Sequence, residues 1–145
     1  MIASNIDWAP TLLDIAELPD IYGMDGVSLR KIASHEVPRH EILYEVWHEN
    51  ETPAMRGVRT MQYKYIYSFC DDTTEQFFDL VNDPEENTNL INDPAYKIII
   101  QYYRCKLDSM RTATGDILND TILNCKLKGR DSSHVGASLN PGPLG

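Results

Sequence analysis

The middle of the sequence holds an alternating aromatic stretch, Tyr63-Lys64-Tyr65-Ile66-Tyr67-Ser68-Phe69. Successive side chains of a β-strand point to opposite faces, so residues two positions apart share a face. This stretch therefore predicts a strand with one aromatic face. Weaker patterns predict three more strands, over Glu41–His48, Ala54–Thr60 and Gln76–Val81. Because only Met61-Gln62 separates two of the four, we expect a tight hairpin and an antiparallel sheet of about four strands.

A helical pattern follows the predicted sheet. Asp93-Pro94 is typical of a helix start, because the Asp side chain accepts free amides and Pro has no amide to leave unpaired. Gly115 is typical of a helix end. Between them runs an apolar stripe at helical spacing, formed by Tyr96, Ile99, Ile100, Tyr103, Leu107 and Met110. We expect this long helix to cover one face of the sheet.

The beginning of the chain predicts a different helix. Asp7 is expected to cap it, Pro10 fits its first turn and Pro19 ends it. Its expected buried side consists of Leu12, Leu13, Ile15 and Ala16. A helix of this kind normally follows a strand in a βα unit, and no strand precedes it here. The expected fold is therefore α+β, with the sheet and long C-terminal helix preceded by a helix that belongs to a missing α/β domain.

These patterns divide the chain into three expected parts. Residues 1–34 form a terminal helical segment of that other domain, and residues 35–116 form the sheet-and-helix subdomain. Residues 117–145 are expected to be disordered, because their end is rich in Gly, Ser and Pro. We see no internal repeat.

Composition excludes several classes of function. The chain has 145 residues and a net charge of −9, and an acidic surface argues against a nucleic-acid partner. No apolar run is long enough to cross a membrane. Three cysteines without a CxxC pattern suggest neither a zinc site nor a full disulfide framework: Cys70, Cys105 and Cys125. The segment Met1–Asp7 lacks the features of a signal peptide, so the compartment stays unknown.

Four phrases occur in order along residues 4–116. They are Ser4–Ala16 with Leu18-Pro19, Met24–Leu29, Gly57–Thr60 with Tyr63–Ile66, and Phe78–Glu86 with Asn89-Leu90. Together they resemble the C-terminal region of the sulfatase family, as in N-sulphoglucosamine sulphohydrolase and related bacterial sulfatases. Two positions depart from that family. Glu17 replaces a usual Gly, which puts the local helix end in doubt, and Met55 replaces a frequent His.

The resemblance implies a catalytic domain similar to that of alkaline phosphatases. Sulfatases use a formylglycine, made in a Cys/Ser-x-Pro-x-Arg motif, and a calcium ion held by Asp and Asn. No Cys or Ser of this chain begins that motif, and none of the family's metal ligands maps to it. We therefore expect no catalytic residue, no metal ligand and no cofactor on this chain. Calcium and formylglycine are implied for the complete enzyme, which in this family is commonly periplasmic, lysosomal or secreted.

Six residues are candidates for substrate binding: Trp47, His48, Glu49, Arg56, Arg59 and Lys64. Arg59 and Lys64 lie in a family motif, where they either pair with acidic groups across the domain junction or reach an anionic group of the substrate. Arg suits bidentate recognition of sulfate or carboxylate. Trp47 lies where a predicted strand ends and a loop begins. There it either packs against other side chains of the protein or stacks on a pyranose ring.

Two functions are consistent with the sequence. The first is the C-terminal part of a sulfatase, which shapes the cleft for a sulfated carbohydrate and partners a missing catalytic domain. The second is a free-standing binding or interaction module derived from a sulfatase.

Overall fold

The computed structural model describes residues 1–21, 23–47, 53–69 and 75–118. Four strands form one sheet in the order β1-β2-β3-β4, with every neighbouring pair antiparallel. Their bounds are Glu41–Val46 (β1), Met55–Thr60 (β2), Tyr63–Ser68 (β3) and Glu75–Asp79 (β4). The predicted four-stranded antiparallel sheet is confirmed, and every strand end lies within two residues of the expected position.

The β2–β3 turn explains how Met61-Gln62 can serve as a hairpin. The hydroxyl oxygen of Thr60 accepts hydrogen bonds from the backbone amides of Gln62 (3.3 Å) and Tyr63 (2.9 Å). It also donates to the carbonyl of Tyr63 at 3.1 Å. A side chain therefore satisfies the turn's backbone groups, so the turn does not depend on a favoured dipeptide.

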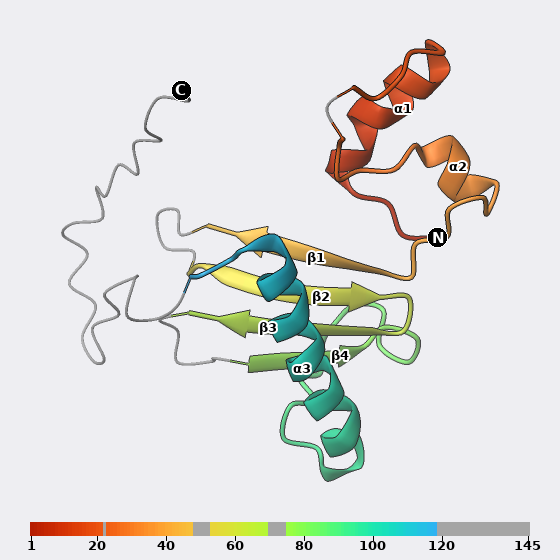
Figure 1. Cartoon of the computed structure of the whole chain (residues 1–145). Helices are drawn as coiled ribbons and strands as arrows, with labels where there is room; N and C mark the ends of the chain where they lie inside the picture. The colour runs from red at the N-terminus through yellow and green to blue at the C-terminus, as the bar shows by residue number, and fades with distance from the viewer. Residues whose placement is uncertain (22, 48–52, 70–74, 119–145) are drawn as a thin grey trace.

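Helix α3, Lys97–Thr114, covers one face of the sheet (Figure 1). A short 3-10 helix, Pro94–Tyr96, leads into it, and the Asp93 carboxylate caps that helix by accepting from the amide of Ala95 at 2.9 Å. Gly115 ends α3 in the left-handed region with φ of +70°. Both predicted ends of the long helix are confirmed.

The core lies between α3 and the sheet. Its buried residues are Val58, Tyr65, Phe77, Ile100, Tyr103 and Leu107. The rest of the predicted helical stripe, Tyr96, Ile99 and Met110, packs around this cluster. Leu43 of β1 also packs on it, so its neighbours in the strand, including Tyr44, face the other side of the sheet.

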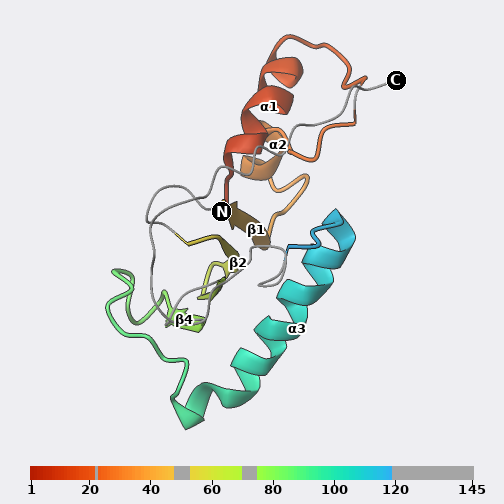
Figure 2. The ribbon, with the colours of Figure 1, turned by 90° about the vertical axis from the view of Figure 1, so that its left-hand side faces the viewer.

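Two short helices, α1 (Trp8–Ile15) and α2 (Leu29–Ala33), lie beyond the β1 edge of the sheet (Figures 1 and 2). A 3-10 helix, Asn5–Asp7, precedes α1. Ser28 caps α2 by accepting from the amide of Arg30 at 3.3 Å. Asp7 occupies the position before α1, but its carboxylate makes no cap hydrogen bond there, so the predicted capping is wrong.

The Asp7 carboxylate is instead the centre of the N-terminal segment. It is fully buried and accepts from the backbone amides of Ser4 (2.8 Å) and Val27 (2.9 Å). Arg39 donates to both carboxylate oxygens, at 2.5 and 2.8 Å. Burial alone would raise the pKa of Asp7, but the hydrogen bonds from Arg39 and the two amides outweigh it and lower the pKa. The carboxylate therefore joins three segments that are distant in sequence.

The expected buried side of α1 is exposed in this chain. Leu12 is 62% exposed and Ile15 58%, whereas Thr11 is the buried residue of the helix. Within the described residues, the small elements around Asp7 pack on the Thr11 side of α1 and leave Leu12 and Ile15 exposed, which agrees with the expectation that this helix belongs to another domain. The packed region also runs past the expected boundary at residue 116, since Leu118 is buried against Ala54 and Phe69.

Within the described residues, no helix combines the length and the apolar character needed to cross a bilayer.

Candidate functional site

The structure divides the candidate residues between the two faces of the sheet. Arg56 and Arg59 are three positions apart on β2, so their side chains leave the sheet on opposite sides. Trp47 contacts Arg56 on the α3 side, whereas Lys64 pairs with Arg59 in the β2–β3 register on the other side. The remaining two candidates, His48 and Glu49, lie outside the described residues. The described candidates thus form two clusters.

Arg56 is enclosed on the α3 side, with none of its side chain exposed. Its Nε donates to Asp116 Oδ2 at 2.9 Å, and its Nη1 donates to the carbonyls of Val46 (3.2 Å) and Met55 (3.0 Å). The Arg56 Cζ atom lies 4.7 Å from the centroid of the Trp47 ring. This geometry gives Arg56 a supporting role beneath Trp47, unlike the direct substrate contact that the sequence suggested.

Asp116 holds the Arg56 guanidinium in place. Its carboxylate also accepts from Arg111 Nε at 2.8 Å and from the amide of Leu118 at 3.1 Å. Burial would raise the pKa of Asp116, but the hydrogen bonds from Arg56 and Arg111 outweigh it and lower the pKa to about 2. The carboxylate is therefore ionised at neutral pH and balances the buried cation.

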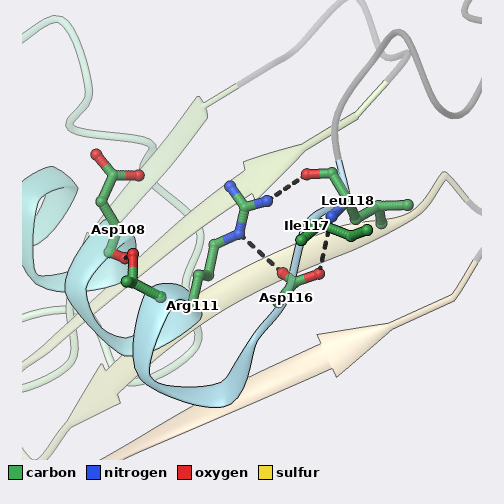
Figure 3. Close-up of a pocket in the computed structure, with 6 residues that line it drawn as sticks. Asp108, Arg111, Asp116, Ile117 and Leu118 are labelled. Atoms are coloured by element: carbon green, nitrogen blue, oxygen red, sulfur yellow. Dashed lines mark hydrogen bonds and ion pairs between the residues drawn. The ribbon is translucent and has the colours of Figure 1, made fainter.

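An open pocket of about 330 Å³ lies beside this carboxylate (Figure 3). Its lining residues are Asp108, Arg111, Thr112, Asp116, Ile117 and Leu118. The Arg111 guanidinium points across it and donates to both Asp116 and the carbonyl of Leu118. Since internal partners already occupy this cation, the pocket is poorly suited to hold an anion.

The second cluster lies on the opposite face. Glu86 accepts from both cations: Arg59 Nη1 lies 3.4 Å from its Oε1, and Lys64 Nζ lies 2.5 Å from its Oε2. Glu86 has a left-handed backbone with φ of +57°. The two cations thus have an acidic partner inside the subdomain, and a further acidic partner across a domain junction stays a prediction. A contact between Arg59 and a substrate anion stays a prediction.

Tyr44 completes the second cluster, and sequence reasoning missed it. Its ring lies over Gly57, where an added Cβ would come within 2.2 Å of Tyr44 Cζ. Its hydroxyl is buried without a hydrogen-bond partner in the described part of the chain. Burial, followed by the charge of Glu86, raises the pKa of Tyr44, so the hydroxyl stays protonated. A glycine inside a predicted strand is a known sign of such a close approach and could have indicated this contact.

The described residues do not fit the cofactor groups of sulfatases. Among the described residues, no group of three or more His, Cys, Asp or Glu side chains could hold a metal ion. Cys105 is exposed on α3 and is followed by Lys106-Leu107, which is unlike the formylglycine motif. No step of sulfate hydrolysis is therefore assigned to the described side chains.

Comparison with known proteins identifies the family. Residues 1–113 match the family model described as "N-sulphoglucosamine sulphohydrolase, C-terminal". Two Bacteroides thetaiotaomicron enzymes are similar to the chain. A Delta 4,5-hexuronate-2-O-sulfatase is 32% identical over 117 residues, covering 77% of this chain and 24% of that protein. An N-acetylglucosamine-6-O-sulfatase is 29% identical over 103 residues, covering 66% and 18%.

A solved structure supports the same assignment. A 2-O GAG sulfatase superposes with a TM-score of 0.67 at 30% identity, over 76% of this chain and 25% of that one. The chain thus spans about a quarter or less of the length of these relatives. Its match to the family model covers α1, α2, all four strands and most of α3. The chain therefore belongs to the N-sulphoglucosamine sulphohydrolase C-terminal family of sulfatases.

Proposed function

We propose that this chain is the C-terminal part of a sulfatase that hydrolyses a sulfate ester or sulfamate of a carbohydrate. In that enzyme a separate α/β catalytic domain carries the nucleophile and the metal. This chain packs against that domain through α1 and places its sheet beside the substrate cleft. Two similar proteins named for sulfated sugars, a hexuronate sulfatase and an N-acetylglucosamine sulfatase, support the carbohydrate substrate.

The exposed apolar stripe of α1 is the observation that carries this proposal. Trp8, Leu12 and Ile15 recur at helical spacing and are 63%, 62% and 58% exposed. Such a stripe on an amphipathic helix normally faces a core. Full burial of a large apolar side chain is worth about 1.5–3 kcal/mol, so covering three of them would give the junction considerable stability. A catalytic domain seated on α1 would supply the missing cover.

A chimeric enzyme tests the proposal. Residues 1–118 replace the matching C-terminal region of the Bacteroides hexuronate sulfatase, and sulfate release from an unsaturated uronate 2-sulfate disaccharide is measured. We expect more activity than in the same enzyme truncated before that region. The isolated chain is expected to release no sulfate, because it contains no Cys/Ser-x-Pro-x-Arg motif.

Two matched variants of the chimera address the junction. Leu12→Asp places a charge in the exposed stripe and is expected to remove the activity gain, because a charge buried at the junction is costly. Ile98→Asp changes an equally apolar residue, 85% exposed on α3, and is expected to leave the gain intact. A folded chimera no more active than the truncated enzyme would contradict the proposal.

The core between α3 and the sheet favours a second candidate, a free-standing binding module. That core is formed within residues 43–110, without any contribution from α1. Hydrogen exchange separates the two candidates. Fast exchange in α1 beside slow exchange in β3 supports a part that another domain completes, whereas equal protection in a monomer supports the free-standing module.

A further inference from the structure

Trp47 is exposed and yet firmly supported. It follows the last residue of β1 and is 56% exposed. The guanidinium of Arg56 covers one face of its ring, with Cζ at 4.7 Å from the ring centroid. The exposed area of the side chain therefore belongs to the opposite ring face and to the ring edges.

The support beneath Trp47 is rigid because Arg56 is held from several directions. Backbone carbonyls of Val46 and Met55 and the carboxylate of Asp116 accept hydrogen bonds from its guanidinium. The cation–π contact with the buried guanidinium restrains the Trp47 ring further. A ring fixed in this way has little rotamer freedom left to lose, which lowers the cost of binding a ligand.

The surroundings of Trp47 differ from those of the other tryptophan. Trp8 belongs to the apolar stripe of α1, which suits a protein partner. Trp47 belongs to neither hydrophobic cluster and borders charged groups: Arg56 below it, and Glu45, whose side chain is 37% exposed, 3.3 Å from Arg56 Nε. A flat apolar face with polar groups at its border is complementary to a pyranose, which presents C–H groups on a face and hydroxyls at its rim.

We propose that Trp47 is a stacking platform for the apolar face of a pyranose ring, positioned by Arg56 and Asp116. The proposal rests on the proposed function, because it assigns a contact for the glycan of the parent sulfatase. Trp47 contacts the sugar ring rather than its sulfate group. In the described part of the cluster, Asp116 engages both Arg56 and Arg111, which leaves neither cation free to bind an anionic group of the ligand. Binding at Trp47 is therefore independent of sulfation.

The binding test uses the chain with Trp8→Phe, so that Trp47 is its only tryptophan. The probes are N,N′-diacetylchitobiose and its 6-sulfate, followed by indole fluorescence and saturation-transfer NMR. We expect saturable binding with a Kd of about 1–10 mM, as suits one stacked ring, and less than about a twofold difference between the two probes. Absence of binding, or binding of the sulfated probe only, overturns the proposal.

Variants then separate contact from positioning. Trp47→Ala in the same background is expected to abolish binding, while Trp47→Phe keeps a ring and retains part of it. Arg56→Lys keeps the charge but loses the planar fork, so we expect binding to weaken about five- to tenfold and near-UV circular dichroism of Trp47 to decrease. If Arg56→Lys does not fold, the two Trp47 variants decide alone. A folded Trp47→Ala variant that still binds overturns the proposal, and the chimera's hydrolytic activity reports separately on the proposed function.

Discussion

The N-terminal segment and the sheet subdomain are built in opposite ways. In the sheet subdomain, apolar side chains of three strands and α3 bury one another around Val58 and Phe77, both 0% exposed. In residues 1–39, a buried carboxylate, Asp7, holds the backbone together, and the large apolar side chains of α1 point outward. A segment whose helix α1 exposes an apolar stripe is suited to be completed by another surface, whereas the sheet subdomain already contains its own core.

The first prediction compares one buried and one exposed apolar residue from the two regions. Phe77→Ala removes a ring that stacks on Tyr63 at 5.2 Å, and it should lower the free energy of unfolding by about 3–5 kcal/mol. Leu12→Ala on α1 should change it by less than about 0.5 kcal/mol, because the side chain already faces solvent. Urea denaturation followed by circular dichroism gives both values. Similar losses in the two variants would contradict the comparison.

The second prediction concerns the polar centre of the N-terminal segment. Asp7→Asn keeps the shape of the side chain but removes the charge that pairs with Arg39, and it should destabilise this segment by about 3 kcal/mol. The loss should be local. Hydrogen exchange in residues 1–39 should accelerate, while amides of β3 and α3 keep their protection. Asp25→Asn is the matched control, since Asp25 lies in the same segment outside the Asp7 hydrogen bonds. Faster exchange throughout the sheet would show that the two regions unfold together.

The third prediction concerns the loss of folding stability at acid pH, which both regions should share. The folded-state pKa values of Asp7 and Asp116 lie below those of unfolded chains, so these ionised carboxylates stabilise the fold above about pH 4. That contribution is lost as pH falls through the folded pKa, which is about 2 for Asp116. Asp116→Asn should cost about 2 kcal/mol at pH 7 and flatten the fall of Tm between about pH 4 and pH 2. An unchanged slope in a folded variant would contradict the assigned charge balance.

Local signals explain what the sequence predicted well. The alternation in Tyr63–Phe69 identifies β3, and Asp93 and Gly115 mark both ends of the long helix, because each signal acts within a few residues of itself. The alternation of side chains and the helix-end residues therefore predicted the elements of the sheet subdomain without reference to the rest of the chain.

Distant partners explain what the sequence missed. Asp7 looked like a cap because Arg39, which redirects its carboxylate, is 32 residues away. Arg56 looked available to a substrate because Asp116 is 60 residues away. The odd spacing of Arg56 and Arg59 on a single strand could already have placed them on opposite faces of the sheet.

The last prediction compares substitutions at the two residues that end α1 and α3, Glu17 and Gly115. Glu17 follows α1 with φ of +56°, and the amide of Leu18 reaches back to the carbonyl of Leu13 at 2.9 Å, which is the hydrogen bond that a glycine normally permits at a helix end. The backbone thus keeps the geometry expected of the usual Gly, with the strain of a Cβ added.

Glu17→Gly should therefore stabilise α1 by about 0.5–1 kcal/mol, with Glu17→Ala as the control that keeps the Cβ and should give no gain. Gly115→Ala is the reverse change at the end of α3. A Cβ there meets no atom within 4 Å, so its expected cost of about 1 kcal/mol comes from the backbone φ of +70° alone. Exchange rates of residues 8–18 report the first change and urea denaturation the second. If the gain at Glu17 also slows exchange in β3, the N-terminal segment and the sheet share one unfolding transition, and the division drawn between them fails.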